Sequence, residues 1–249
     1  MSVELSVVIP LYNEEPNVAP LLAELSAILT SMPVPHEVVL IDDGSTDGTF
    51  EVLRRTQKSH QHVRAVRFAR NFGQTAAFAA GFAYARGQFI VTFDGDLQND
   101  PADIPRLLEI ARTHDVVCGW RKDRKDDFLT RYVPSVIANQ LIGLVSGVHV
   151  HDVGCSLKVF RAEVVKPLKL TPGMHRYLPA LASQLGDRVT EVVVNHRPRR
   201  FGHSKYGLSR TFRVVSDLVK LRRLMREAVD PATPVPQLYE VAEILEPKA

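Results

Sequence analysis

Cysteine is scarce in this chain, which has 249 residues and only two cysteines, Cys118 and Cys155. Both lie in apolar stretches, so a disulfide framework is not expected and a reducing cytoplasm agrees with the composition. Cys155 has no metal-ligand spacing around it, and we expect it to be a small packed residue.

A long uninterrupted apolar run is also missing. The longest candidate, 133–150, contains Asn139 and Gln140 and is weak as a membrane span. Met1 leads directly into a strand pattern with no visible signal peptide. We therefore expect a protein that is not integral to a membrane.

Charge of one sign is not in large excess. The net charge is +3, which is too small to indicate a nucleic-acid binder without a concentrated basic patch. Hydrophobic residues make up 45% and charged residues 24%, as in an ordinary globular protein long enough for one large domain with additions.

Strand and helix patterns alternate along the chain. Short apolar runs predict strands at 5–9, 37–41, 63–68, 89–93, 116–119, 157–160 and 189–194. Apolar residues at helical spacing predict intervening helices, among them 18–29, 74–85 and 104–111. This order predicts an α/β fold with a mainly parallel, Rossmann-like sheet and helices on both faces.

Three polar loops follow predicted strands, at 10–14, 42–45 and 94–98. In an open α/β sheet, ligands bind outside the carboxyl ends of the strands, where these loops would meet. In the third loop, Asp94 and Asp96 flank Gly95, a spacing that points both carboxylates the same way and suits Mg²⁺ or Mn²⁺. Taken alone, an Asp-x-Asp spacing is more simply explained as a solvated turn before a helix that begins at Pro101. The two other polar loops at the same edge of the sheet favour a metal site instead.

Neither a dinucleotide-binding glycine motif nor a P-loop is present in the first loops. Carboxylates in their place imply that a metal carries a pyrophosphate. Tyr12 offers a ring for stacking on a base, and Glu14 and Asp43 can accept hydrogen bonds from a base or ribose. These acceptors suit uracil or guanine.

The segments 6–14, 41–49 and 94–98 together resemble the family 2 glycosyltransferases of GT-A fold. Within that family, residues 4–215 look like the polyprenyl-phosphate sugar transferases, the group of dolichol-phosphate mannose synthase and bactoprenol glucosyltransferase. The resemblance implies transfer of a sugar from a nucleotide donor with inversion. It also implies nucleoside contacts by Pro10, Tyr12, Glu14 and Asp43, and a metal and diphosphate site of Asp94, Gly95, Asp96 and Gln98, with Asp94, Asp96 and Gln98 on the metal.

Arg131 and Ser135 are four residues apart at the start of a predicted helix, where backbone N–H groups and the helix dipole favour an anion. The resemblance assigns them, with Arg121, to the acceptor phosphate. Asp152 matches the position of a general base in many related transferases. A phosphate acceptor is already ionised at neutral pH, so Asp152 could instead orient Arg121 or Arg131.

The segment 195–207 is rich in arginine and lysine and has Gly202 and Gly207 as candidate hinges. We expect a cationic flap over the leaving diphosphate, because charge develops there as the glycosidic bond breaks. By resemblance Arg199, Ser204 and Lys205 contact this group, with Arg200 as an alternative to Arg199.

We therefore expect a catalytic domain at 1–207, an amphipathic helix at 208–228 and a polar tail at 229–249. The helix has an apolar stripe flanked by basic residues, which predicts peripheral attachment to the anionic inner face of the cell membrane. Packing of the helix on the domain is the alternative.

The predicted function is inverting, metal-dependent transfer of a hexose from a UDP-sugar or GDP-mannose to polyprenyl phosphate. The alternatives are the same donor chemistry with a non-lipid acceptor, and a noncatalytic nucleotide-sugar-binding subunit of a membrane complex.

Overall fold

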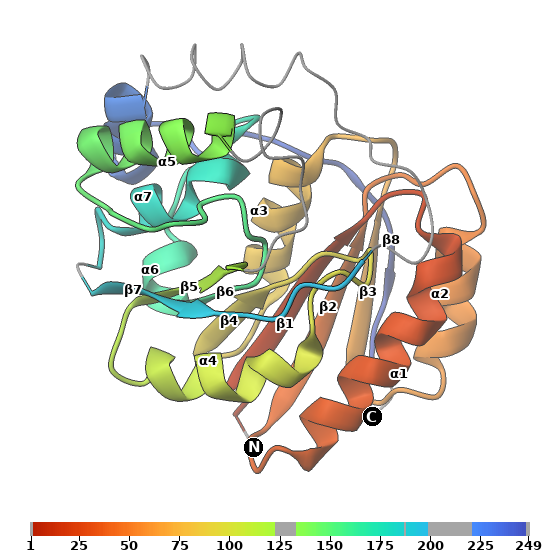
Figure 1. The fold of residues 1–249 in the computed structure, drawn as a ribbon. Helices are drawn as coiled ribbons and strands as arrows, with labels where there is room; N and C mark the ends of the chain where they lie inside the picture. The colour runs from red at the N-terminus through yellow and green to blue at the C-terminus, as the bar shows by residue number, and fades with distance from the viewer. Residues whose placement is uncertain (1, 123–132, 187, 199–220, 248–249) are drawn as a thin grey trace.

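The computed structural model describes residues 2–122, 133–186, 188–198 and 221–247, without the side chains of 133–138. Within these residues the chain forms one eight-stranded sheet with the order β7-β5-β6-β4-β1-β2-β3-β8 (Figure 1). The strands are β1 (Leu5–Leu11), β2 (His36–Asp42), β3 (Val63–Phe68), β4 (Phe89–Thr92), β5 (Val116–Trp120), β6 (Lys158–Arg161), β7 (Val189–Val193) and β8 (Val241–Leu245).

The centre of the sheet is parallel, as the alternation of strands and helices predicts. Strand β1 pairs in parallel with β2 and β4, and β2 pairs in parallel with β3. Strand β6 runs antiparallel between β4 and β5, and β7 is parallel to β5. The predicted α/β fold with a mainly parallel sheet is confirmed.

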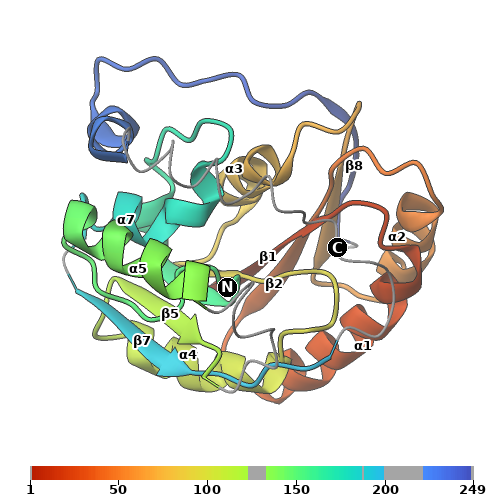
Figure 2. The same ribbon diagram turned by 45° about the horizontal axis from the view of Figure 1, so that its top comes forward.

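Helices cover both faces of the sheet because side chains alternate along each strand. Val7 and Ile9 of β1 pack with α1, α2 and α4, whereas Val8 packs with α3, α6 and α7 on the other face. Figure 2 shows α1 and α7 on opposite sides of the sheet. The helices are α1 (Glu15–Ser31), α2 (Thr49–Gln57), α3 (Gln74–Tyr84), α4 (Ile104–Ala111), α5 (Val133–Ser146), α6 (Ala162–Val165) and α7 (Leu178–Ala182), with 3₁₀ turns η1 (Pro101–Asp103) and η3 (Met174–Tyr177).

The last turns of the expected amphipathic helix are described as helical residues 221–229. Leu221, Met225 and Ala228 are buried in the core, so this part packs on the domain as the alternative interpretation held. The backbone N–H of Lys169 donates to the carbonyl of Ala228 at 2.9 Å and holds the end of the helix. Residues 208–220 lie outside the described residues.

The expected polar tail also contains a strand. Residues 241–245 form β8, which pairs antiparallel with β3 at the edge of the sheet. The run Val-Ala-Glu-Ile-Leu has the alternation of a half-buried strand, and this signal was missed because the segment follows a proline-containing polar stretch. Among the helices in the described part of the chain, none has the length and apolar character needed to cross a membrane.

Candidate active site

The three polar loops meet at the carboxyl edge of the sheet, because β1, β2 and β4 are parallel neighbours. The backbone N–H of Asp43 donates to the carbonyl of Leu11 at 2.8 Å, which joins the first two loops. Asn13 strengthens this junction, since its N–H donates to Ser45 Oγ at 2.9 Å and its side-chain oxygen accepts from the N–H of Thr46 at 2.8 Å. The sheet therefore brings 10–14, 42–45 and 94–98 together.

Asp43 holds the loop that leads into α3. Its carboxylate accepts hydrogen bonds from the backbone N–H groups of Phe72 at 2.7 Å and Gly73 at 2.9 Å, and from the Asn71 side chain at 3.0 Å. Burial raises the pKa of Asp43 to about 6, and the neighbouring charge of Asp42 adds to the shift while the N–H groups oppose it. Sequence reasoning missed this clamp, and a contact between Asp43 and a nucleoside stays a prediction.

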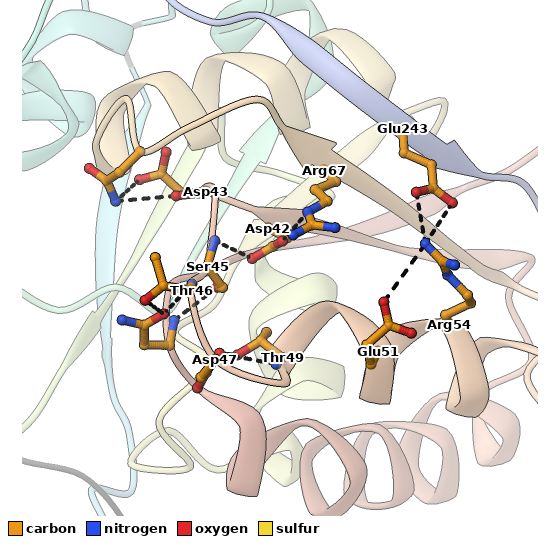
Figure 3. Close-up of polar contacts among 12 residues, drawn as sticks. Asp42, Asp43, Ser45, Thr46, Asp47, Thr49, Glu51, Arg54, Arg67 and Glu243 are labelled. Atoms are coloured by element: carbon orange, nitrogen blue, oxygen red, sulfur yellow. Dashed lines mark hydrogen bonds and ion pairs between the residues drawn. The ribbon is translucent and has the colours of Figure 1, made fainter.

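A cleft of about 420 Å³ opens beside Tyr12, within the range of small-molecule sites, roughly 300–1,000 Å³. Arg67 borders it and lies 3.6 Å from the buried carboxylate of Asp42 (Figure 3). Glu14 is not among the lining residues, and its carboxylate accepts from the Asn17 side chain at 2.6 Å. The lining residues are Tyr12, Gly44, Ser45, Thr46, Arg67, Phe68, Ala69, Arg70, Asn71, Ala242 and Glu243.

Asp94 and Asp96 lie on the loop after β4, as the apolar run 89–93 before them predicts. Burial and, to a smaller extent, repulsion from the Asp96 charge raise the pKa of Asp94 to about 6, although the nearby charges of Arg121 and Lys158 oppose the shift. The loop is packed closely, since a Cβ at Gly95 would lie 2.3 Å from the side chain of Leu11. Leu97 has a left-handed φ of 63° and a buried side chain, which anchors the turn between Asp96 and Gln98.

The donor set of this loop fits a hard divalent cation. A cation between the two carboxylates would offset the repulsion between them. Mg²⁺ or Mn²⁺ takes its other ligands from water and phosphate oxygen. In the described residues no group of three or more histidine, cysteine, aspartate or glutamate side chains could hold a metal.

Ser156 connects Asp94 to the rest of the loop. Its hydroxyl donates to Asp94 and accepts from the Asn99 side chain at 2.8 Å, while its carbonyl accepts from Thr92 Oγ1 at 2.6 Å. Gln74, at the start of α3, donates to Asp94 Oδ1 at 3.2 Å. Sequence reasoning missed Ser156 and Gln74, whose roles depend on contacts across distant strands.

Asp152 forms an ion pair with Arg121. The guanidinium of Arg121 donates to the two carboxylate oxygens at 2.7 and 3.0 Å, and both side chains are largely buried. This two-pronged geometry fixes the plane of the guanidinium. The structure therefore gives Asp152 the orienting contact with Arg121 that was one of its two predicted roles.

Lys158 is a buried cation behind the Asp94 loop, with 4% of its surface exposed. Its ammonium donates to the carbonyl of Cys155, and its charge lies close enough to Asp94 to favour the ionised carboxylate. The signal was present in the sequence as a lysine inside the apolar run 157–160, where a charged side chain needs a specific partner.

The remaining predicted site residues are only partly described by the structure. Arg131, Arg199, Arg200, Ser204 and Lys205 lie outside the described residues, and Ser135 lies on the first turn of α5 without a described side chain. Pro10 lies in β1, at the same edge of the sheet as Asp94. At the start of the expected flap, the carbonyl of Arg197 accepts from the Gln98 side chain at 3.4 Å and its guanidinium pairs with Glu24 and Asp100.

The family model described as Glycosyl transferase family 2 matches residues 6–168, which include all three loops and the Arg121–Asp152 pair. The chain belongs to this family. A dodecaprenyl-phosphate galacturonate synthase from Rhizobium johnstonii is 47% identical over 92% of the chain and 70% of its own length. An undecaprenyl-phosphate 4-deoxy-4-formamido-L-arabinose transferase from Edwardsiella ictaluri is 40% identical over 86% of the chain and 66% of its own length. The chain thus spans about two thirds of the length of these relatives.

Solved structures support the GT-A fold of this family 2 glycosyltransferase. A glucosyl-3-phosphoglycerate synthase from Mycobacterium tuberculosis, in complex with UDP, has a TM-score of 0.66 at 20% identity and covers 88% of the chain and 79% of its own. The same enzyme in complex with Mn²⁺, UDP-glucose and phosphoglyceric acid has a TM-score of 0.62, with 94% and 81% covered. At this identity the likeness concerns the fold alone.

Proposed function

We propose that the chain transfers a hexose, with inversion, from a UDP-sugar or GDP-mannose to polyprenyl phosphate at a membrane surface. The observation that carries this proposal is that the segment 152–158 contacts both pairs of charged residues. Asp152 pairs with Arg121, and Ser156 and Lys158 interact with Asp94, which lies beside Asp96. Both curated relatives are named for a polyprenyl-phosphate acceptor, which supports the same acceptor class here.

On the donor side, Tyr12 and its cleft take the nucleoside, while Asp94, Asp96 and Gln98 hold Mg²⁺ or Mn²⁺. A metal bound there would neutralise charge on the diphosphate as it leaves. Gln74 and Ser156 keep the Asp94 carboxylate in place by hydrogen bonds. Arg199 or Arg200, with Ser204 and Lys205, adds positive charge over the same group.

On the acceptor side, Arg121 binds the lipid phosphate together with Arg131 and Ser135. The phosphate oxygen is already ionised at neutral pH, so it can attack the sugar without losing a proton to the enzyme. The protein's task is then to align this oxygen with the bond that breaks. Asp152 is a positioning residue in this scheme, because it holds the guanidinium of Arg121 from behind.

Two features favour attachment to a membrane surface. Leu141 and Leu144 on α5 have 40% and 73% of their surface exposed, and Arg222, Arg223 and Arg226 are exposed on the 221–229 helix. Exposed leucines can enter the interfacial region of a bilayer, and arginines favour anionic headgroups. We propose a peripheral location at the inner face of the cell membrane, alone or beside a separate membrane subunit.

A thermal-shift screen of UDP- and GDP-sugars with Mn²⁺ tests the donor half of the proposal. Ligands that bind the folded state alone raise its melting temperature, by mass action. We expect a shift that needs both one class of nucleotide and the metal, and loss of the shift in Asp96→Asn. No shift with any nucleotide sugar would contradict the proposal.

A further inference from the structure

The C-terminal strand β8 forms one wall of the cleft beside Tyr12. Ala242 and Glu243 line this cleft together with residues of the loops that follow β1 and β2. Strand β8 is antiparallel to β3, so its first residues lie at the carboxyl edge of the sheet, where the other site loops are. A segment more than 170 residues away in the sequence from Arg70 therefore borders the same space.

Strand β8 is held by contacts that also fix the other walls. Tyr239, just before the strand, stacks on Phe68 with ring centroids 4.9 Å apart and planes at 9°. The carbonyl of Glu240 accepts from the backbone N–H of Ala69 at 2.9 Å. Phe68 and Ala69 both line the cleft, so the docking of β8 sets the position of the chain that leads to Arg70.

An ion pair ties β8 to helix α2. Glu243 accepts from the guanidinium of Arg54 at 2.8 and 3.1 Å, which Figure 3 shows beside Arg67 and Asp42. Arg54 and Arg67 both lie over the ring of Phe50, at 5.3 and 4.8 Å from its centroid. A shift of Glu243 would therefore move Arg54 and the Phe50 ring, and through them Arg67, which lines the cleft.

Further along, the strand is fastened independently. Glu246 pairs with the largely buried Arg64 at 3.0 Å, and its carbonyl accepts from the Gln57 side chain at 2.6 Å. These contacts lie at the end of β8 that is far from the cleft, since β8 runs antiparallel to β3. They anchor the end of the segment, whereas Ala242 and Glu243 line the cleft.

We propose that β8 belongs to the nucleotide site and that Ala242 and Glu243 form part of the pocket for the nucleoside. Donor binding and docking of the C-terminal strand then stabilise each other. This inference rests on the proposed function, which places the nucleoside in this cleft. Thermodynamic linkage then requires that the nucleotide protects β8 by the same free energy by which docked β8 strengthens nucleotide binding. The strand is thus a determinant of donor affinity outside residues 6–168.

The test measures the affinity of UDP and GDP with Mn²⁺ by calorimetry on the full chain. Glu243→Arg places two positive charges together, and we expect affinity for the preferred nucleotide to fall about tenfold, within the usual range of coupling between sites. The exchanged pair Arg54→Glu with Glu243→Arg restores the attraction and should return the affinity to within about twofold.

A second variant does not depend on the ion pair. Ala242 is exposed, so Ala242→Leu adds volume to the cleft without disturbing the core, and we expect a similar loss of affinity. The matched control is Glu4→Arg, which breaks a comparable pair between Glu4 and Arg112 at 2.8 Å, at the start of β1 and far from the cleft. We expect the control to bind nucleotide as the wild type does.

Hydrogen exchange gives the reciprocal measurement. Amides of residues 241–245 should exchange more slowly when the nucleotide is added to the wild type, and the Glu4→Arg variant should behave in the same way. Unchanged affinity in both Glu243→Arg and Ala242→Leu, with no protection of β8 by nucleotide, would overturn the inference. A wild type that binds neither nucleotide would instead contradict the proposed function.

Discussion

The carboxylate of Asp94 is contacted by residues from distant parts of the chain. It lies beside Asp96, accepts hydrogen bonds from Gln74 and Ser156, and has the buried charge of Lys158 behind it. Burial and the Asp96 charge disfavour its ionised form, and these partners offset part of that cost. The arrangement suits a site whose charge is completed by a bound cation.

At this scale we predict that Asp96→Asn abolishes turnover. The change removes one of two formal charges that would hold the metal, and loss of about 3 kcal/mol of transition-state stabilisation lowers the rate roughly a hundredfold. The rate of sugar transfer with saturating Mn²⁺ is the measurement. Asp230→Asn, at an exposed position, is the control, and near wild-type turnover of Asp96→Asn would remove the metal assignment.

Ser156→Ala should weaken the site more mildly. It removes the hydroxyl that connects Asp94 and Asn99, and one such hydrogen bond contributes about 1 kcal/mol, or roughly a fivefold loss in kcat/KM. We expect the Mn²⁺ concentration needed for half-maximal activity to rise as well. Ser183→Ala, which removes a hydroxyl that donates to the carbonyl of Ala180, should change neither quantity. An unchanged metal requirement in Ser156→Ala would argue that Ser156 is only a structural residue.

At the scale of elements, the segment 152–158 joins the two halves of the site. Asp152 holds Arg121, Ser156 holds Asp94, and Lys158 begins strand β6, which pairs with both β4 and β5. Asp152 and Ser156 lie in the segment just before β6, so one short piece of chain contacts both Arg121 and Asp94.

Asp152→Asn distinguishes the two roles considered for this residue. As a positioning residue, Asp152 loses one charge-assisted contact of about 1.5–3 kcal/mol, so KM for the lipid phosphate should rise about ten- to a hundredfold. The value of kcat at neutral pH should change less than KM does, and the pH profile of kcat should keep its shape. Disappearance of an acid limb from that profile in the variant would instead identify Asp152 as a general base.

The sequence predicts the parallel part of this fold because its strands are short apolar runs with helices between them. It also predicts the three site loops, since they follow adjacent parallel strands. It does not predict β8, because pairing of a half-buried edge strand with β3 depends on Tyr239 and Glu243 meeting residues far away in the chain. The hydrogen bonds from the N–H groups of Phe72 and Gly73 to Asp43 are not predicted either, because they join residues about 30 positions apart in the chain.

At the scale of the whole molecule, the exposed leucines of α5 and the exposed arginines of the 221–229 helix are the groups that we propose meet a lipid surface. We predict binding to anionic vesicles that weakens as salt rises, because basic residues near an anionic leaflet contribute about 1 kcal/mol each and salt screens them. Co-sedimentation with vesicles of anionic or neutral lipid at low and high salt is the measurement.

The variant Leu141→Ser with Leu144→Ser should weaken this binding, whereas Leu185→Ser, another exposed leucine, serves as the control. Equal binding to neutral and anionic vesicles, or none to either, would leave the packed-helix interpretation for 208–228 and point to a separate membrane partner.

The most direct test of the central claim is sugar transfer by the purified chain. Polyprenyl phosphate in detergent, Mn²⁺ and the nucleotide sugar that binds in the thermal-shift screen are combined, and the lipid product is followed by mass spectrometry. We predict a polyprenyl-phosphate hexose of inverted anomeric configuration, formed only with the metal and not by Asp96→Asn. Transfer to a soluble acceptor at the same rate without the lipid phosphate, or donor binding without any transfer, would contradict the account.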